Sequence, residues 1–504
     1  MEIDTAWRIA LLMGGSIFLG TFTLGIIFTG CMCRLSRRWD ALDKPDGFLK
    51  CHVRPTATLG GIPIFAALIV GAGIILIFSY DLSELFAELM HGSFSWGALL
   101  VAAGLILSIG ICDDLRQVMP RTKLLFQMLA ATVLIGSGLV IRQCGFFADF
   151  HWSLGLLAVP FTLFWLIGSC NAFNFIDGMD GLAPGLGVVA SLVLALLGFI
   201  NEAYLSALLA LALAGSLFAL LLFNIKPAAI FLGDSGSQLV GLLLGVLSIK
   251  TATFNGVFIL PTPVLVLSIP IIDAFLSILR RYSRATSPAC GDHKHIHHCL
   301  RRLGLSVRET SMTLWVVALA CGIMGLVCRL AQGMQVALAG IAFLGVEFYL
   351  GVRLGCLDCR ALYRRITGLD HKGTRPVPKR PDHAHLAQLA KLWEDMKPLF
   401  EQMQLDRAIL TLEKVNEQGR CKYETYQWVR SENLLTELLR SRWTKRFALG
   451  GDEPRIATLQ LESAERFYRD ERRIDWLLQQ ISENMRFSSL SKTNVVEELV
   501  QSGT

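Results

Sequence analysis

The sequence predicts an all-α polytopic membrane protein that ends in a small soluble α+β domain. Of its 504 residues 53% are hydrophobic, and the mean hydropathy is +0.51. Only 17% are charged, against roughly 25% in soluble chains. Up to Leu354 the apolar residues form blocks of about 20, the length that crosses a bilayer. From Gly355 to Thr504 no such block occurs, and charges of both signs are frequent.

About eleven apolar segments qualify as transmembrane helices, because backbone groups in lipid must be hydrogen-bonded within their own segment. The first segment is longer than the apolar core of a signal peptide and follows Glu2 and Asp4. We therefore expect it to stay in the mature protein. The segments lie near residues 8–33, 59–80, 96–112, 123–141, 153–173, 185–201, 203–223, 236–254, 257–279, 311–330 and 335–354.

Positive charges gather on one side of these segments. Six Lys and Arg residues separate the first two segments and seven separate the ninth and tenth, whereas the loops of the other side hold few. Positive loops face the cytoplasm, so the N-terminus is predicted outside and the C-terminal tail inside. The net charge of +6 is too weak to indicate a nucleic-acid partner. The 13 cysteines lie mostly in apolar or cytoplasmic segments, which argues against a disulfide framework.

The tail after the membrane domain, residues 1–354, is predicted to have two parts. Residues 355–382 include a stretch rich in Pro, Lys and Arg, which is typical of a linker. Residues 383–504 predict an α+β domain with no catalytic motif. Helices are expected near 384–405 and 463–485, and strands within DRAILTLE, KYETYQWVR, RWTKRFAL and PRIATLQLE.

Polar motifs interrupt the apolar chain on the predicted cytoplasmic side. The first is Cys112-Asp113-Asp114, at the end of the third segment. Adjacent carboxylates at a membrane boundary are costly unless they meet a cation. Lys123, at the start of the next segment, could supply a positive charge at the same site. The alternative is a solvated helix end.

The second motif is NAFNFIDGMDG, which begins at Asn171. Asn174, Asp177 and Asp180 are spaced three apart, so on a helical turn they would share a face. Their oxygens are hard ligands suited to Mg²⁺. A calcium-binding EF-hand loop is excluded because its twelfth position, counted from Asp177, is Val188 rather than Glu. A merely polar loop is the remaining alternative.

The third motif, FLGDSG, enters the eighth segment and contains Asp234. Asp234 or Ser235 could cap the helix, and the small residues around them would let backbone N–H groups bind a phosphate at the helix N-terminus. We expect both roles together. Gly185 and Gly187 also fit a dinucleotide fingerprint, but they lie inside an apolar segment without a βαβ pattern, so we reject that function.

Two further motifs are basic. HIHH contains His295, His297 and His298, which are too close in sequence to surround one zinc ion without other ligands. Recognition of phosphate by charge or hydrogen bonds fits them better. Lys50 and His52 precede a glycine pair. Taken alone, these two residues indicate only the positive charge that is usual in a cytoplasmic loop.

Together these motifs resemble the polyprenyl-phosphate N-acetylhexosamine-1-phosphate transferases over about residues 1–354. The HIHH form and eleven segments are more similar to the WecA-like branch than to the MraY branch of peptidoglycan synthesis. One departure from the family pattern is Ala57, where a second proline is common.

The resemblance implies transfer of a sugar 1-phosphate, most often N-acetylglucosamine 1-phosphate, from a UDP-N-acetylhexosamine to undecaprenyl phosphate, with release of UMP. It implies a bacterial cytoplasmic membrane location and Mg²⁺, or Mn²⁺, held by the metal ligands Asn174 and Asp234. Other partners would be membrane lipid, a homodimer and a pathway protein bound by the tail. The implied catalytic residues are Asp113, Asp114, Lys123, Asp177 and Asp180, and the implied substrate-binding residues are Lys50, His52, Asn171, His295, His297 and His298.

Two rival functions stay open. One is a phospho-MurNAc-pentapeptide transferase-type activity, and the other is a multi-span secondary transporter. A transporter should place its polar site near the bilayer midplane, whereas these motifs cluster at segment ends on one side. Neither the donor sugar nor the role of the tail follows from the sequence.

Overall fold

The computed structural model describes residues 2–39, 41–43, 55–79, 94–116, 118–147, 149–284, 295–331, 333–357, 363, 394, 397 and four strands between 407 and 463. The chain divides into two compact units. The first comprises residues 1–285 and 292–363, and the second comprises residues 286–291 and 364–504.

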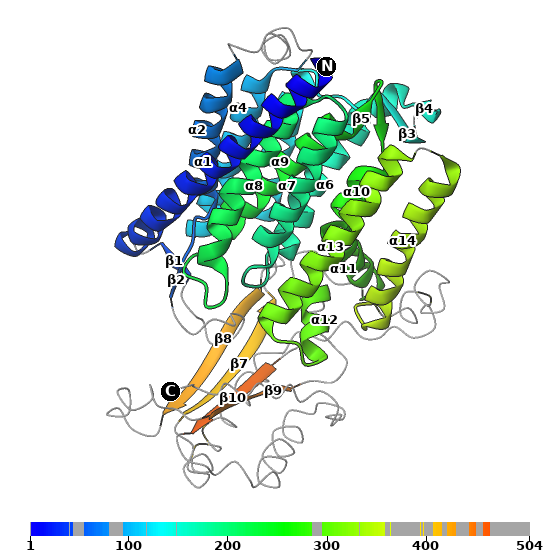
Figure 1. Cartoon of the computed structure of the whole chain (residues 1–504). Coiled ribbons are helices and arrows are strands. Elements are labelled where there is room, and N and C mark those ends of the chain that lie inside the picture. The colour runs from blue at the N-terminus through cyan, green and yellow to red at the C-terminus, as the bar shows by residue number, and fades with distance from the viewer. Residues whose placement is uncertain are drawn as a thin grey trace. The chain divides into compact units, whose positions relative to one another are not determined.

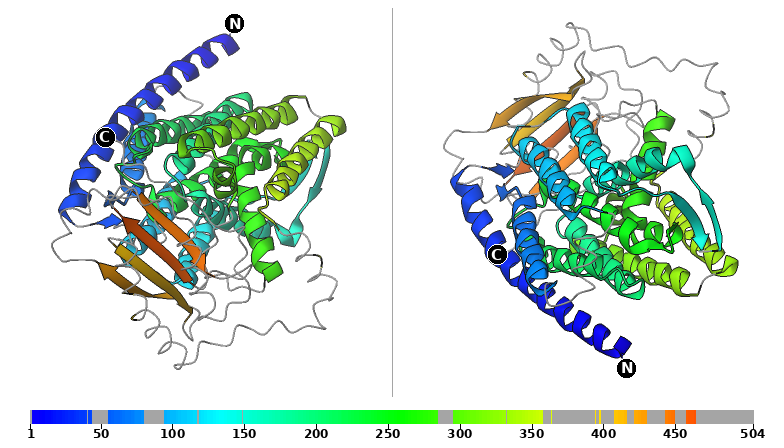
Figure 2. Two further views of the ribbon diagram at one scale, coloured as in Figure 1. Left: turned by 90° about the horizontal axis from the view of Figure 1, so that it is seen from below. Right: turned by 90° about the horizontal axis from the view of Figure 1, so that it is seen from above.

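The first unit is a bundle of helices, seen from the side in Figure 1 and from its two ends in Figure 2. Eight of the described helices are long and apolar enough to cross a membrane, which confirms a multi-pass membrane protein. The helices are α1 (Glu2–Arg38), α2 (Gly61–Ser79), α4 (Trp96–Arg116), α5 (Pro120–Gly136), α6 (Ala158–Ile176), α7 (Leu182–Ile200), α8 (Tyr204–Asn224), α9 (Gly233–Ala252), α10 (Pro261–Val266), α11 (Ser268–Arg284), α12 (Ile296–Arg302), α13 (Val307–Leu330) and α14 (Met334–Arg353).

Helix α9 forms the centre of the bundle. Nearly all its residues are buried, and α2, α4, α6 and α7 pack against it. Its contact with α6 is close because a Cβ added at Gly241 would lie 2.5 Å from the carbonyl oxygen of Ser169. The N-terminus of α9, where Asp234 lies, is therefore surrounded by the ends of its neighbours.

One predicted segment, 257–279, is not a single helix. It contains strand β6 (Val257–Ile259), the short helix α10 and then α11. Pro270 lies in the first turn of α11 and has no N–H to continue a preceding helix, which explains a break near Leu267.

A small sheet lies in the membrane unit, at the end of the bundle opposite the N-terminus of α9. Its strand order is β4-β3-β6-β5, with β3 (Gln143–Phe147) parallel to β6 and antiparallel to β4 (Phe150–Ser153). Strand β5 (Thr253–Phe254) pairs antiparallel with β6. The predicted segments starting at 153 and 257 began in these strands. Strands of two to five residues are too short to recognise by alternation.

The second unit contains the four predicted strands, which form an antiparallel sheet in the order β8-β7-β10-β9. The α+β prediction is confirmed for its strands. The predicted helices lie almost wholly outside the described residues, and the domain boundaries remain a prediction. The strands are β7 (Arg407–Val415), β8 (Cys421–Val429), β9 (Trp443–Leu449) and β10 (Ala457–Ser463).

Candidate active site

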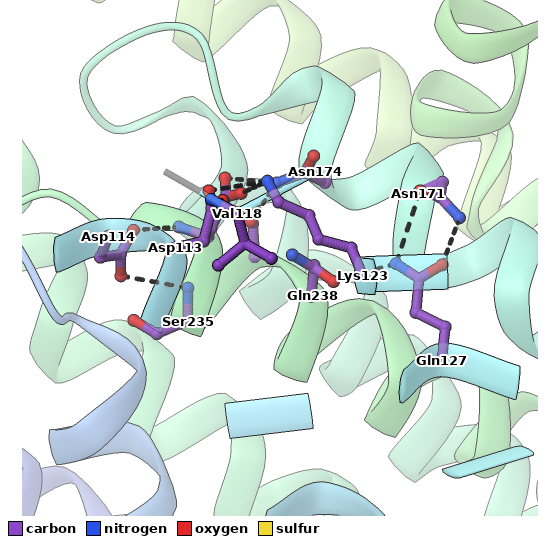
Figure 3. A network of polar contacts seen from close by, with 11 residues as sticks. Asp113, Asp114, Val118, Lys123, Gln127, Asn171, Asn174, Ser235 and Gln238 are labelled. Atoms are coloured by element: carbon purple, nitrogen blue, oxygen red, sulfur yellow. Dashed lines mark hydrogen bonds and ion pairs between the residues drawn. The ribbon is translucent and has the colours of Figure 1, made fainter. Parts of the chain in front are cut away.

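Four helix ends bring the predicted acidic motifs together. In Figure 3 the Lys123 side chain, at the start of α5, reaches the end of α4, where its Nζ lies 2.7 Å from Asp113 Oδ2. The same ammonium group pairs with Asp234 Oδ2 at the start of α9. Asn174, near the end of α6, donates from Nδ2 to Asp234 Oδ1 at 2.8 Å. The sequence places these four residues in three separate motifs and a lone lysine, and the fold unites them.

Asp113 is also held by the turn that follows its helix. The backbone N–H of Val118 donates to Asp113 Oδ1 at 2.5 Å. One carboxylate oxygen is thus bound by the backbone, while the other faces Lys123. This arrangement fixes the direction of the Asp113–Lys123 pair.

Asp114 caps a different helix. Its Oδ1 accepts from the backbone N–H of Asp234 at 2.8 Å, and its Oδ2 accepts from that of Ser235 at 3.2 Å. These are the second and third residues of α9, where N-capping oxygens normally bind. The prediction that Asp234 or Ser235 caps α9 is therefore wrong, and Asp114 takes the N–H groups that we assigned to a phosphate. The catalytic role of Asp114 remains a prediction.

Glycines allow the FLGDSG turn to be enclosed so tightly. Gly233 has a φ of +71°, and a Cβ there would lie 2.8 Å from either carboxylate oxygen of Asp114. A Cβ at Gly61 would lie 2.5 Å from the carbonyl of Ser235, and one at Gly110 would lie 2.4 Å from its Cα. The glycine pair at 60–61 thus has a packing role. Lys50 and His52 lie outside the described residues.

A layer of amides lies one helical turn deeper in the bundle. Gln127 pairs with Asn171, whose Nδ2 donates to Gln127 Oε1 at 2.9 Å, and Gln127 Nε2 donates to Gln238 Oε1 at 2.9 Å (Figure 3). Asn171 also donates to the Ile167 carbonyl at 2.8 Å. Both glutamines are almost fully buried.

Gln127 and Gln238 were not predicted as site residues from the sequence. Each follows a site residue by four positions on the same helix, Lys123 on α5 and Asp234 on α9, and this spacing could have revealed them. In the structure Asn171 serves as part of this amide layer, and its predicted substrate contact is not tested.

The NAFNFIDGMDG motif changes from helix to turn within its length. Helix α6 ends at Ile176, and the turn that follows includes Gly178 and then Gly181, with a φ of +78°. Asn174, Asp177 and Asp180 therefore do not share a helical face, contrary to our prediction. At Gly181 the chain adopts a positive φ, which glycine tolerates and most other residues avoid.

Asp177 lies among other acids. Burial, together with the negative charges of Asp234 and Asp114, raises the pKa of its carboxyl to about 8. Asp180 adds a smaller contribution of the same sign. At neutral pH Asp177 therefore keeps its proton most of the time, and the single Lys123 faces the three acids Asp113, Asp114 and Asp234.

The histidine motif packs against this turn. A Cβ at Gly178 would lie 2.9 Å from His297 Nε2. The ring centroid of His297 lies 4.2 Å from that of His298 and 5.7 Å from that of His295. The three predicted histidines thus gather beside Asp177 and Asp180.

His297 is neutral at physiological pH. Burial, aided by the neighbouring His298, lowers the pKa of His297 to about 3. Neither ring nitrogen has a hydrogen-bond partner among the described residues, although both are buried. His297 therefore does not attract phosphate as a cation.

The acidic and amide side chains of this site are candidate ligands of a divalent metal ion. In the described part of the chain no three His, Cys, Asp or Glu side chains gather as a ready metal site. Mg²⁺ commonly uses only one or two protein ligands together with waters and phosphate oxygens. The amide oxygen of Asn174 and the carboxylate of Asp234 are hard donors on adjacent side chains, and a cation there would replace the contacts that the Asn174 NH₂ and Lys123 make with Asp234 in this structure. The donor set fits Mg²⁺.

Known proteins resemble this chain over its membrane part. Residues 96–252, which include α4 to α9, match the family described as glycosyl transferase family 4. A probable undecaprenyl-phosphate N-acetylglucosaminyl 1-phosphate transferase of Bacillus subtilis is 29% identical over 319 residues, which are 62% of this chain and 84% of that protein.

Two other relatives carry similar names. A decaprenyl-phosphate N-acetylglucosaminephosphotransferase of Mycolicibacterium smegmatis is 32% identical over 300 residues, 54% of this chain and 72% of that protein. An undecaprenyl-phosphate alpha-N-acetylglucosaminyl 1-phosphate transferase of Escherichia coli K12 is 25% identical over 343 residues, 67% of this chain and 88% of that protein.

Proposed function

The chain belongs to glycosyl transferase family 4, and on this premise we propose that it transfers N-acetylglucosamine 1-phosphate from UDP-N-acetylglucosamine to undecaprenyl phosphate. UMP is the second product. The observation that carries the proposal is the network of Asp113, Lys123, Asp234 and Asn174 at four adjoining helix ends. At such a place a phosphate in the bilayer and a nucleotide from the water can meet.

In the proposed reaction an oxygen of the lipid phosphate attacks the β-phosphorus of the UDP-sugar. The bond from that phosphorus to the bridging oxygen breaks, and UMP leaves with the electron pair. A phosphate monoester has a second pKa of about 6 and is mostly dianionic at neutral pH. Asp113 therefore orients the acceptor through Lys123 and takes a proton only from the monoanionic fraction. Lys123 neutralises charge on the phosphoryl oxygens.

Asn174 and Asp234 would hold Mg²⁺ or Mn²⁺, which when bound neutralises diphosphate charge. We assign Asp177 and Asp180 to the nucleotide and the three histidines to the diphosphate and sugar. The position of the polar network at helix ends, rather than in mid-span, supports this function over transport.

We further propose that the site faces the cytoplasm of a bacterium, with the N-terminus outside. The reaction would then begin synthesis of a cell-envelope glycan, and the C-terminal domain would regulate it or recruit a pathway protein. Deletion of 371–504 should lower activity or pathway flux in cells, and an unchanged flux would contradict a role of the tail.

The test uses the purified full-length protein with undecaprenyl phosphate, Mg²⁺ and four donors. These are UDP-GlcNAc, UDP-GalNAc, a UDP-diNAc-bacillosamine and UDP-MurNAc-pentapeptide. We expect UMP only with the lipid acceptor, and fastest with UDP-GlcNAc. Asp234→Ala should abolish release, whereas Asp149→Asn, an exposed acid in the turn between β3 and β4, should not. If only UDP-MurNAc-pentapeptide of the four donors gave UMP, that compound would be the donor instead of UDP-GlcNAc. If folded protein released no UMP with any of the four donors, the proposed function would be refuted.

A further inference from the structure

Asp273 is a buried carboxylate that the proposed reaction has not yet used. It lies in α11, and its exposed fraction is 0%. Its Oδ2 lies 2.7 Å from His295 Nδ1, and its Oδ1 accepts from the backbone N–H of Ile296 at 2.7 Å. Each oxygen thus contacts one of two consecutive residues in the histidine motif.

The contact with Ile296 completes the first turn of α12. His295 occupies the N-cap position of that helix, but its own side chain makes no capping hydrogen bond. Asp273 supplies the missing acceptor from another helix. The Asp273 carboxylate therefore stabilises the start of helix α12, at the histidine motif.

The contact with His295 determines which ring nitrogen carries a proton. An ionised carboxylate only accepts hydrogen bonds, so Nδ1 of His295 must be protonated whether the ring is neutral or charged. The other nitrogen, Nε2, is then the one that binds a ligand or exchanges a proton with it. The His295 side chain keeps 11% of its surface exposed.

The neighbours of His295 connect it to the site. Its ring stacks on His297 and lies 6.5 Å, between centroids, from Phe175, which follows Asn174 on α6. The His295 ring therefore lies close to Asn174, the proposed metal ligand, and to the turn that contains Asp177. A proton fixed at its Nδ1 leaves Nε2 as the nitrogen that can form a hydrogen bond with a ligand.

We propose that Asp273 is a positioning residue, which holds the His295 proton on Nδ1 and thereby presents Nε2 to the diphosphate of the donor. This inference rests on the proposed function, since that function supplies the diphosphate. The contact between Asp273 and His295 is not what holds α12 as a whole in place, because a second contact also fixes this helix. The Sγ of Cys299 lies 2.6 Å from that of Cys356, whose carbonyl accepts from Arg280 at 2.6 Å.

The decisive variant is Asp273→Asn. Its carbonyl oxygen can still accept from Ile296 N–H, so the cap of α12 survives. That bond turns the amide NH₂ toward His295 Nδ1, which must then accept, and the proton of the neutral ring moves to Nε2. Asp273→Asn thus changes the tautomer without removing the side chain.

The first readout is nitrogen-15 NMR of histidine-labelled full-length protein, with His295→Ala to assign the signal. We expect His295 to be protonated at Nδ1 in the wild type and at Nε2 in Asp273→Asn. The same tautomer in both proteins would overturn the inference. This readout does not depend on catalysis, so it separates the inference from the proposed function.

The second readout is a double-mutant cycle on UMP release. Removing the carboxylate partner of a functional histidine costs roughly tenfold to a hundredfold in kcat/KM. We expect that loss for Asp273→Asn alone, and no further loss when His295 is already Ala. Equal losses in both backgrounds would show that Asp273 acts only on the fold. Glu347→Gln, which neutralises an acid beside Cys321 in the same unit, is the control and should keep wild-type kcat/KM. A wild type that releases no UMP would contradict the proposed function, whatever tautomer is found.

Discussion

Replacing Asp114 by Asn should destabilise the membrane unit more than replacing its neighbour Asp113. Asp114 accepts two backbone N–H groups at the start of α9, the helix at the centre of the bundle. Asp113 accepts one backbone N–H and pairs with Lys123 near the surface of the site. Asp114 therefore contributes more to the stability of the fold, and Asp113 contributes more to the reaction.

The structure sets the size of the effect. Asn at 114 keeps one carbonyl oxygen for the Asp234 N–H, but its NH₂ group then faces the Ser235 N–H. Loss of one hydrogen bond to a charged acceptor, with a buried donor left unpaired, costs about 1–3 kcal/mol. At about 2–4 °C per kcal/mol, the Tm should fall by roughly 2–12 °C. Asp113→Asn should lower the Tm by less than about 2 °C.

The assay is thermal unfolding of both variants in the same detergent, followed by UMP release below either Tm. Asp113→Asn should lose nearly all activity with little change in Tm. Asp114→Asn should lower the Tm clearly and reduce activity only in part. Its activity falls because the first turn of α9, which carries Asp234, is no longer held in place. Equal Tm values for wild type and Asp114→Asn would refute the capping role.

Four further outcomes are expected. Lys123→Met should lower kcat/KM for UMP release by at least about a hundredfold, since no other described cation contacts Asp113 and Asp234; a smaller loss would exclude Lys123 from charge stabilisation. Gln127→Leu should lower stability by about 1–3 kcal/mol in thermal unfolding, because it removes the partner of the buried Gln238 amide and one of the two hydrogen bonds that Asn171 donates; an unchanged Tm would show that the amide layer is not stabilising. The pKa of His297 lies below its ordinary 6.5, so below about pH 6.5 the unfolded chain binds a proton that the folded chain excludes, and stability falls as the pH falls. The Tm of His297→Asn should drop less between pH 7 and pH 5 than that of the wild type, and equal drops would contradict a buried neutral His297. Mg²⁺ at a hundred times its Kd should stabilise the wild type by about 2.7 kcal/mol and Asp234→Ala much less; equal gains in Tm would exclude Asp234 as a ligand.

The helices could be predicted from the sequence better than their interruptions. Apolar blocks of about 20 residues identify spans because the bilayer requires that length, and each predicted span overlaps a helix. The break before Pro270 was missed because the block stays apolar across it. The turn after Ile176 was missed because the three-residue spacing of its acids suggested a continuing helix, despite Gly178.

The candidate site could be predicted only in the polar residues that stand out in the apolar chain. Asp113, Lys123, Asn174 and Asp234 could be found because polar groups at apolar segment ends are costly. The partners of Asp114 and Asp273 could not be found, since they lie 120 and 22 residues away along the chain and depend on how the helices pack. A carboxylate in the sequence looks the same whether it binds substrate or caps a helix.

The most direct test of the account follows the β-phosphorus of the donor. The full-length protein would receive UDP-GlcNAc labelled with phosphorus-32 in its β position, together with undecaprenyl phosphate and Mg²⁺. The account predicts that the label enters the organic phase with the lipid while unlabelled UMP appears in the water. Label that stays in water as UDP, with sugar alone on the lipid, would contradict transfer of a sugar phosphate.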